Sequence, residues 1–432
     1  MDTACFHDTR KNESWPGGGR RASGACSEVA VCVLTSSHDP YDDRIFYKEA
    51  RSLRKAGYAV TIIAPTASSD EASEGIVIQR LRMSRTFGHS RFRVLERVAR
   101  FIWVGMRQRA RVYHCHEWDA VIAGCMIRFL KRWTCGQRVK VVNEIRDSFP
   151  GVWPSGERRS RLTSLKTSVC TLLDKAVNCR ADYIIAVEEP KADRCVAFGF
   201  PRERAVTVEN YAPLELFPFS PKRFDRNNLV LAYAGGVSKQ RGIYVLAQAS
   251  AEIGRRMGLR PKFLLLGHFR SAIEQNAFVE FCRRDEKLFE LDMRWVPHPE
   301  VGKRLSEADI CFALFYDSPR YEWVLSGKAG PLKLYEYMAC GKPVIAVDYK
   351  ALRETIEAHD CGLIVPTKGG DIEVANAIEY YLSSPREMHR HGRNGRIAVE
   401  RLYNWSRGER KLLAVYASLL SSAHDCSSHL TA

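Results

Sequence analysis

The chain has 432 residues, of which 45% are hydrophobic and 27% charged, and its formal net charge is +16. This length is too great for one ordinary core and suits two domains of roughly 200 residues each. The fourteen cysteines are scattered without a CxxC pair, which excludes a regular disulfide framework and favours a reducing compartment. No run approaches the roughly eighteen apolar residues that a spanning helix needs, so we expect a soluble or peripheral protein.

Residues 1–27 are rich in Gly, Ser, Arg and Asp and have no apolar core of a signal peptide, so we expect a disordered leader. The next residues, 28–37, predict a buried parallel strand, and a helix over 45–56 and a strand over 58–65 follow. Strand, helix and strand in about forty residues make a βαβ unit. Further strands are expected at 75–80, 112–115, 139–143, 183–187 and 205–208. Residues 28–208 therefore predict one doubly wound sheet.

Much of the positive charge lies in this first half, in residues 85–111, 128–133 and 156–166. Arginines alternate with apolar residues over 91–111, as in a basic amphipathic helix that lies on anionic lipid. An ordinary solvated helix with its apolar side in the core explains the pattern equally well. Nucleic acid is a weaker choice, because no helix-turn-helix, zinc or RNP pattern accompanies the charge.

Residues 209–228 contain three prolines and little periodicity, which indicates an interdomain linker. A second alternation fills 229–404, with helices such as 242–257 and 370–382. Its strands are expected at 229–233, 262–266, 293–295, 310–314, 342–347 and 362–364. The predicted fold class is α/β, with two Rossmann-like doubly wound domains facing across a cleft. Residues 405–421 have the apolar spacing of a packed helix. We expect residues 422–432 to form a flexible tail.

Two segments of the second half suit a nucleotide diphosphate. Gly235 and Gly236 follow a strand, and Lys239 and Arg241 precede a helix, so main-chain amides, a helix dipole and a guanidinium can hold phosphate oxygens. A glycine turn with solvated charges is the alternative. Residues 330–349 read GPLKLYEYMACGKPVIAVDY, with Glu336 the carboxylate of an otherwise apolar helix.

One carboxylate can accept two hydrogen bonds from neighbouring ribose hydroxyls. Lys333 lies three residues before Glu336 on the same helical face, so both can reach one nucleotide. A plain helix-turn-strand unit with a surface Glu is the alternative.

Residues 330–349 resemble the C-terminal motif of glycosyltransferase family 4, retaining enzymes of GT-B fold, in the subgroup with P-x-K-L-x-E-Y-M-A-x-G-K-P-V-I-A. Residues 38–53, HDPYDDRIFYKEARSL, are similar to the N-terminal hallmark of that subgroup. The resemblance implies that the loop with Arg241 holds the donor diphosphate and that the final helix crosses back to the first domain.

The first domain carries the remaining candidates. His114 and His116 alternate on one face of a strand end, but two histidines do not specify a metal site. The resemblance places His116 in the cleft against the transferred sugar and leaves His114 a core role. Asp43, Arg44 and Lys48 lie at the switch-point edge where an acceptor would enter, with N-capping the alternative for Asp43. Residues 143–150, NEIRDSFP, resemble a loop of the family, which implies that Asp147 contacts the acceptor or the donor sugar, with a structural loop equally possible.

Several positions depart from the family pattern. Gly236 stands where many relatives have Arg, so Lys239 or Lys333 must supply the second cation. Lys328 stands where the common form has a Glu that contacts the sugar, although the P-x-K subgroup also lacks it. Arg146 replaces an expected His. No D-x-D triplet occurs, so we expect no metal and no cofactor.

These features predict a retaining, metal-independent glycosyltransferase that uses a UDP- or GDP-sugar and a glycan or lipid-linked acceptor. His116, Arg241 and Glu336 are its expected catalytic residues. The protein would be cytoplasmic or peripheral on the inner face of a membrane, with anionic lipid as a further partner and no nucleic acid. A GT-B scaffold that binds nucleotide or membrane without catalysis is the alternative, and a UDP-sugar epimerase is weaker because it lacks the K-L-x-E-Y-M-A motif.

Overall fold

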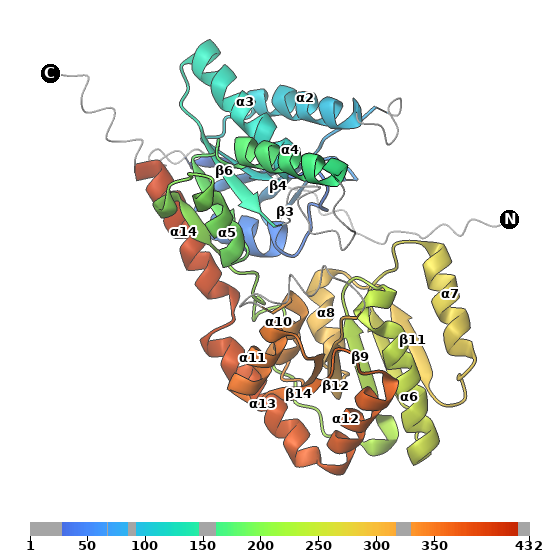
Figure 1. Ribbon diagram of the computed structural model, residues 1–432. Coiled ribbons are helices and arrows are strands. Elements are labelled where there is room, and N and C mark those ends of the chain that lie inside the picture. Colours follow the sequence, from blue (N-terminus) through green and yellow to red (C-terminus); the bar gives the residue numbers. More distant parts are fainter. Residues whose placement is uncertain (1–27, 67, 85–91, 147–160, 317–329, 422–432) are drawn as a thin grey trace, which may run out of the picture.

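The computed structural model describes residues 28–66, 68–84, 92–146, 161–316 and 330–421, which form two α/β domains, one above the other in Figure 1. Each domain is built on a largely or wholly parallel sheet with helices packed against it. The prediction of two doubly wound domains is therefore confirmed.

The N-terminal sheet has eight strands in the order β3-β4-β2-β1-β5-β6-β7-β8, and only β3 pairs antiparallel. Its central strands are runs of Val, Ile and Ala, as expected for strands covered on both faces. The strands are β1 (Ala30–Leu34), β2 (Ala59–Ala64), β3 (Glu71–Ser73), β4 (Ile76–Arg80), β5 (Val112–His116), β6 (Lys140–Ile145), β7 (Tyr183–Ala186) and β8 (Ala205–Thr207).

Helices cover both faces of this sheet. Along β1, Val31 and Val33 pack toward η1, α1 and α14, whereas Cys32 and Leu34 pack toward α2 and α3, since strand side chains alternate. η1 is a π-helical turn that continues directly into α1. The helical segments are η1 (Ile45–Ala50), α1 (Arg51–Lys55), α2 (Phe92–Arg107), α3 (Trp118–Cys135), α4 (Arg161–Asn178), α5 (Glu189–Ala197) and η2 (Arg202–Arg204).

The C-terminal sheet has six parallel strands in the order β11-β10-β9-β12-β13-β14. They are β9 (Val230–Ala234), β10 (Lys262–Leu266), β11 (Glu290–Arg294), β12 (Ile310–Ala313), β13 (Val344–Val347) and β14 (Gly362–Val365). The helical segments are η3 (Arg226–Asn228), η4 (Lys239–Arg241), α6 (Ile243–Met257), α7 (Ala272–Arg283), α8 (His298–Leu305), α10 (Leu332–Ala339), α11 (Lys350–His359), α12 (Asp371–Ser383) and α13 (Pro385–Arg401).

The final helix, α14 (Trp405–Ser421), leaves the C-terminal domain and packs on the N-terminal one (Figure 1). At its start, the indole N–H of Trp405 donates to the Ser52 hydroxyl at 2.9 Å, and its amide donates to the Ala212 carbonyl at 3.0 Å. The outgoing linker and the returning chain are thus bonded to each other where they cross. Across the described ranges, none of the helices combines the length and the apolar character needed to traverse a bilayer.

Candidate active site

A cavity of about 220 Å³ lies between the two domains. Its walls come from the loops after β1 and β6 on one side and from the start of α10 on the other, with Asn210 and Tyr211 of the linker between them. Ligands of doubly wound sheets bind outside the carboxyl ends of the strands, and this cavity lies at those ends in the N-terminal sheet. A molecule bound there would touch both domains and the linker.

The turn after β9 carries the glycines predicted to bind the donor, and neither these glycines nor Arg241, Lys333 and Glu336 line the interdomain cavity. Gly235 has φ +119°, a conformation that only glycine adopts easily, and Gly242 has φ +71° at the N-terminus of α6. A side chain at Gly242 would also clash, since its Cβ would lie 2.4 Å from the Leu314 Cβ. Both glycines are thus required by the backbone, which carries Arg241 into position at the end of η4.

Lys333 is the cation nearest to this turn. Its Nζ would lie 3.5 Å from a Cβ at Gly235, it stands 3.7 Å from the ring centroid of Tyr233, and its side chain is buried. Among the described residues, Nζ has no hydrogen-bond partner. Burial, and then the charge of Arg241, lower the pKa of Lys333 well below its usual value, while Glu336 acts in the opposite direction.

The charged groups of Arg241 and Lys333 both lie near the aromatic ring of Phe315. The Arg241 guanidinium carbon lies 5.2 Å, and the Lys333 Nζ 5.5 Å, from the centroid of Phe315. The charge of Arg241 acts on Lys333, and since like charges repel, a bound anion that contacts both would relieve the repulsion. The structure thus brings Gly235, Arg241 and Lys333 together, whereas Lys239 is exposed and has no comparable contact with the turn.

Glu336 has a partner that the sequence did not indicate. His298, at the start of α8, places Nε2 at 3.0 Å from Glu336 Oε1. The same imidazole lies 5.7 Å from the ring of Tyr47, which belongs to the N-terminal domain. Burial alone would lower the pKa of His298, but the hydrogen bond and charge of Glu336, with the charge of Asp43, outweigh it and raise the pKa. His298 therefore connects the donor side to the opposite domain.

The raised pKa of His298 predicts that the stability of the fold depends on pH. We expect the pKa of His298 to lie above about 6.5, the value of an ordinary histidine. A histidine whose pKa is raised in the folded protein stabilises the fold fully at a pH below its pKa in the unfolded chain. This contribution is lost as the pH rises through its pKa in the folded protein. The melting temperatures of wild type and His298→Gln should therefore differ most below about pH 6.5 and converge as the pH rises through the folded pKa of His298.

The pKa itself is measurable from the histidine ring protons by NMR, assigned by their loss in His298→Gln. Glu336→Gln should bring it down, because the neutral amide removes the carboxylate charge. A wild-type pKa below that of a free histidine would contradict the assignment.

On the acceptor side, a second cavity of about 260 Å³ is lined by residues that follow β1, β5 and β6. Glu117 is one of its lining residues and has an unusual φ of +64°, and several donors contact its carboxylate. That carboxylate accepts from the Ser36 amide at 2.8 Å and from the Ser37 hydroxyl at 3.1 Å, and it lies 3.0 Å from His38 Nε2. Burial alone would raise the pKa of Glu117, but His38 and the other donors lower it to about 2.

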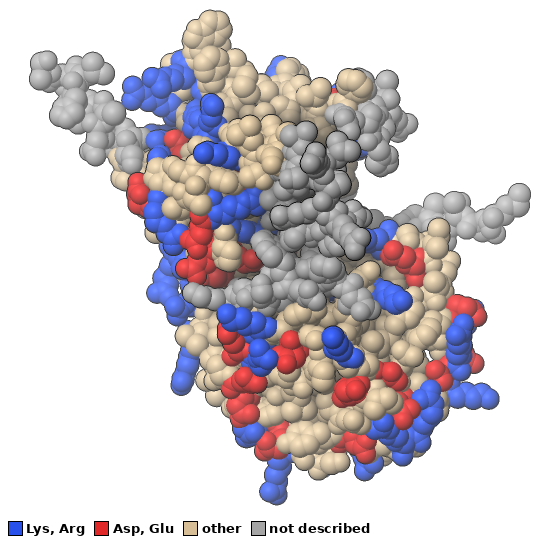
Figure 2. Space-filling view, in the orientation of Figure 1, with Lys and Arg blue, Asp and Glu red and all other residues tan. Residues whose placement is uncertain are grey.

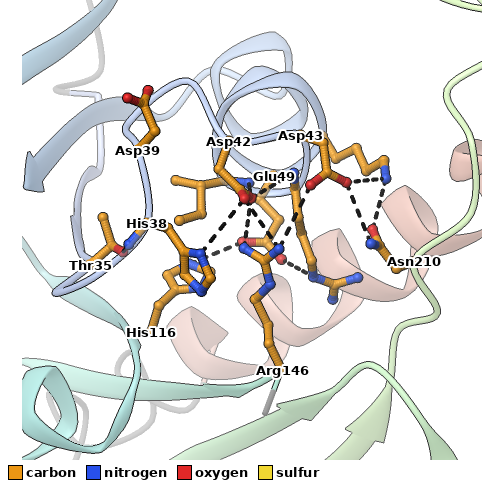
Figure 3. A network of polar contacts seen from close by, with 12 residues as sticks. Thr35, His38, Asp39, Asp42, Asp43, Glu49, His116, Arg146 and Asn210 are labelled. Atoms are coloured by element: carbon orange, nitrogen blue, oxygen red, sulfur yellow. Dashed lines mark hydrogen bonds and ion pairs between the residues drawn. The ribbon is translucent and has the colours of Figure 1, made fainter. Parts of the chain in front are cut away.

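Arg146 joins this cavity to the interdomain one and appears in the polar network of Figure 3. It donates to Asp42 at 2.6 and 3.2 Å and lies 3.7 Å from Asp43. Asp43 also accepts from Lys48, whose ammonium contacts Asn210 at 2.7 Å. Burial alone would raise the pKa of Asp43, but Lys48, Arg146 and His298 lower it. Arg146 therefore anchors the loop after β1.

Behind this network lies a fully buried ionic cluster. Arg44 Nε lies 2.7 Å from Glu144 and 2.8 Å from Glu49. His116 Nε2 lies 3.3 Å from Glu49, and His114 Nε2 lies 3.5 Å from Glu144. By distance, Glu49, His114 and His116 could ligate a metal ion, since their ligand atoms lie within 4.8 Å of one another. A divalent ion would be repelled by the adjacent Arg44 guanidinium, so we interpret the cluster as a structural ion network.

The predicted site residues are thus distributed unevenly. Arg44, Lys48 and His116 are buried and held by carboxylates, so in this conformation their side chains do not line either cavity. Asp43 lies near the cleft, with His298 among the charges that act on it. Asp147 and Lys328 fall outside the described residues. The residues that the sequence did not single out for this role are His38, Glu117 and His298, and only the position of the first two after predicted strands could have indicated them.

Both halves of the chain match family models of glycosyltransferases. Residues 44–211 match the model of the glycosyl transferase 4-like domain, and residues 218–398 match that of glycosyl transferases group 1. D-inositol 3-phosphate glycosyltransferase of Gordonia bronchialis is 24% identical over 256 residues, 56% of this chain and 53% of that protein. The putative teichuronic acid biosynthesis glycosyltransferase TuaH of Bacillus subtilis is 25% identical over 200 residues, 44% of each chain. The matches span about half the length of these curated relatives.

Solved structures resemble the whole fold. Sucrose-phosphate synthase from Thermosynechococcus elongatus superposes with a TM-score of 0.67 at 19% identity, covering 91% of this chain and 100% of that one. HepE of Anabaena in complex with UDP-glucose superposes with a TM-score of 0.63 at 14% identity, covering 90% of this chain and 100% of that one. At these identities the likeness shows the fold alone. The two family models follow one another along the two domains, and the chain belongs to the GT-B glycosyltransferases of the family 4-like kind.

Proposed function

We propose that this protein transfers a sugar from a nucleotide diphosphate sugar to a hydroxyl group of a glycan or lipid-linked acceptor, in the synthesis of a polysaccharide. The observation that carries the proposal is the buried Lys333 ammonium beside Arg241 and the Gly235 turn. Two positive side chains meet there, a guanidinium and an ammonium, and the ammonium has no acceptor among the described residues. The Gly235 amide already donates to the Leu266 carbonyl at 2.9 Å, so the two side chains are the groups to which a diphosphate would offer acceptors.

The reaction is mainly a matter of leaving-group stabilisation. As the bond between the anomeric carbon and the β-phosphate oxygen breaks, negative charge grows on that oxygen, and Arg241 and Lys333 bind it more tightly than in the ground state. The acceptor oxygen forms the new bond on the same face of the sugar, and its proton passes to the departing phosphate. This course retains the anomeric configuration and leaves Glu336 to orient the nucleotide ribose.

The acceptor would enter from the N-terminal domain. The cavity around His38 and Glu117 offers one imidazole and one carboxylate that can hydrogen-bond sugar hydroxyls. In this proposal the ionic cluster with Arg44, Lys48 and His116 keeps that wall in place. The solved HepE complex contains UDP-glucose, which favours a UDP-sugar as the first donor to try.

The test is a thermal-shift screen of UDP, GDP and their sugars on the full chain, followed by a product assay with the donors that bind. We expect one nucleotide to raise the melting temperature, and the increase to continue with the logarithm of its concentration once the site is filled. We also expect product formation to persist after dialysis against EDTA. Loss of activity on dialysis, with recovery on adding Mg²⁺ or Mn²⁺, would overturn the metal-independent mechanism, whereas binding without turnover over a broad panel would support an inactive scaffold.

A further inference from the structure

A wide groove lies on the N-terminal domain where the strands of the sheet begin, at the end of the sheet opposite the cleft. It has a volume of about 870 Å³ and is formed by the residues that precede β5 and β6, by the second half of α3 and by the end of α14. Figure 2 shows Lys and Arg side chains gathered in this region, between the ends of α3 and α14. The cationic side chains that line it are Arg109, Arg111, Arg128, Arg132, Arg138 and Lys140, against one carboxylate, Asp182.

Most of this charge is not neutralised within the protein. Asp182 accepts from Arg128 at 2.7 Å and lies 3.7 Å from Lys140. The other four arginines are exposed, and within the described part of the chain no carboxylate pairs with them. Like charges that share a concave surface raise the local potential and attract an anion. Guanidinium groups match phosphate oxygens especially well.

Helix α3, which forms part of the groove, also carries an apolar ridge. Met126, Phe129 and Trp133 are spaced by three and four residues on α3, so they share a face, and they are 42%, 63% and 80% exposed. Leu419 and Leu420 of α14 add an apolar wall to the groove itself. Exposed aromatic residues beside a cationic surface are typical of a protein that lies at a membrane interface.

The neighbouring helix extends this surface. α2 packs against α3 on the same face of the sheet (Figure 1), and its Phe92, Leu95 and Trp103 are each more than half exposed. The arginines of α2 contribute less charge than the sequence suggested. Arg97 pairs with the buried Asp119, and Arg100 donates to Glu96 at 2.6 Å.

We propose that the groove and the α3 ridge dock this protein on an anionic lipid bilayer, with lipid phosphates among the four unpaired arginines and Phe129 and Trp133 at the acyl boundary. A soluble anionic glycan would satisfy the arginines and leave the aromatic ridge in water, whereas a bilayer surface satisfies both. The inference does not depend on which sugar is transferred.

Co-sedimentation with vesicles tests it, using phosphatidylcholine vesicles with and without phosphatidylglycerol. We expect binding to the anionic vesicles alone, with a strong decrease between about 0.1 M and 1 M salt, where the screening length falls from about 10 to 3 Å. Each arginine near the surface contributes roughly a fivefold change in partitioning. Arg132→Glu/Arg138→Glu should therefore lower the partition coefficient at least about 25-fold.

A matched control changes the same net charge on the other domain. Arg284→Glu/Lys287→Glu alters two exposed cations next to α7 and should leave most of the binding intact. Phe129→Ser/Trp133→Ser keeps the charge and should still weaken binding several-fold, and the blue shift of tryptophan fluorescence on binding should diminish in Trp133→Phe. Circular dichroism checks that each variant is folded.

Four outcomes would overturn the proposal. They are absence of vesicle binding at low salt, equal binding to neutral vesicles, undiminished binding of Arg132→Glu/Arg138→Glu, and binding to a soluble polyanion such as polygalacturonate without binding to vesicles. Competition by glycerol phosphate that removes the protein from anionic vesicles would support it, since that probe carries the headgroup chemistry alone.

Discussion

Arg241→Ala and Lys333→Met are each expected to lower kcat/KM for the sugar nucleotide by about two to three orders of magnitude. Removal of one preorganised group that stabilises transition-state charge typically costs this much. The two side chains flank Phe315 beside the Gly235 turn, and both would face the charge that develops on the β-phosphate. Release of nucleoside diphosphate, measured over a range of donor concentrations, gives kcat and KM separately.

Lys239→Ala is the discriminating control, because Lys239 is the other candidate for the second cation. It is exposed, so we expect its loss to lower kcat/KM by less than about tenfold. The effect of Arg241→Ala should appear mainly in kcat, since an interaction formed in the transition state is lost. A folded Arg241→Ala or Lys333→Met protein with unchanged kcat/KM would refute the diphosphate assignment.

Arg44→Met should destabilise the N-terminal domain by about 3–5 kcal/mol, the usual cost of leaving a buried charge without its partner. The guanidinium lies between Glu49 and Glu144, and all three side chains are buried. Burial alone would raise the pKa of Glu49, but Arg44 and His116 lower it. The wild-type cluster therefore stabilises the fold above a pH of about 4.3 and loses this contribution as the pH falls.

Hydrogen exchange of the β1 and β5 amides at increasing urea concentrations measures this domain separately from the other. Arg51→Met is the matched control, because Arg51 follows η1 and pairs with a half-exposed Glu74, for which a loss below about 1 kcal/mol is expected. Arg44→Met/Glu144→Gln should recover part of the stability, since it removes one unpaired carboxylate. Equal losses in Arg44→Met and Arg51→Met would contradict the interpretation.

The fold was predictable because its signals are local. The apolar run of residues 229–233 followed by Gly235 specifies a strand and a tight turn with only ten residues of context, and the structure has β9 and a left-handed glycine there. The apolar run of residues 344–347 likewise indicates a strand from local sequence alone, and the structure has β13 there. The short antiparallel β3 was missed because its sequence, Glu-Ala-Ser, has no strand pattern and it pairs only at the sheet edge.

The site was less predictable because burial and long-range pairing are not local. Arg44 and Lys48 belong to a charged motif that suggests a surface, yet both are buried by partners about 100 and 160 residues away, Glu144 and Asn210. His298 gave no motif signal, since its partner Glu336 lies 38 residues later and its neighbour Tyr47 is in the other domain. Only the assembled cleft reveals such contacts.

The packing of α14 on the N-terminal domain has a consequence for biosynthesis. Tyr416 Oη lies 2.9 Å from His114 Nδ1, and Trp405, Leu412 and Val415 complete the core around β1. A ribosome releases the first domain long before it makes these residues, so the nascent N-terminal half exposes this hydrophobic face until α14 has been synthesised. A chain that stops before α14 would therefore keep this part of the N-terminal core exposed to solvent.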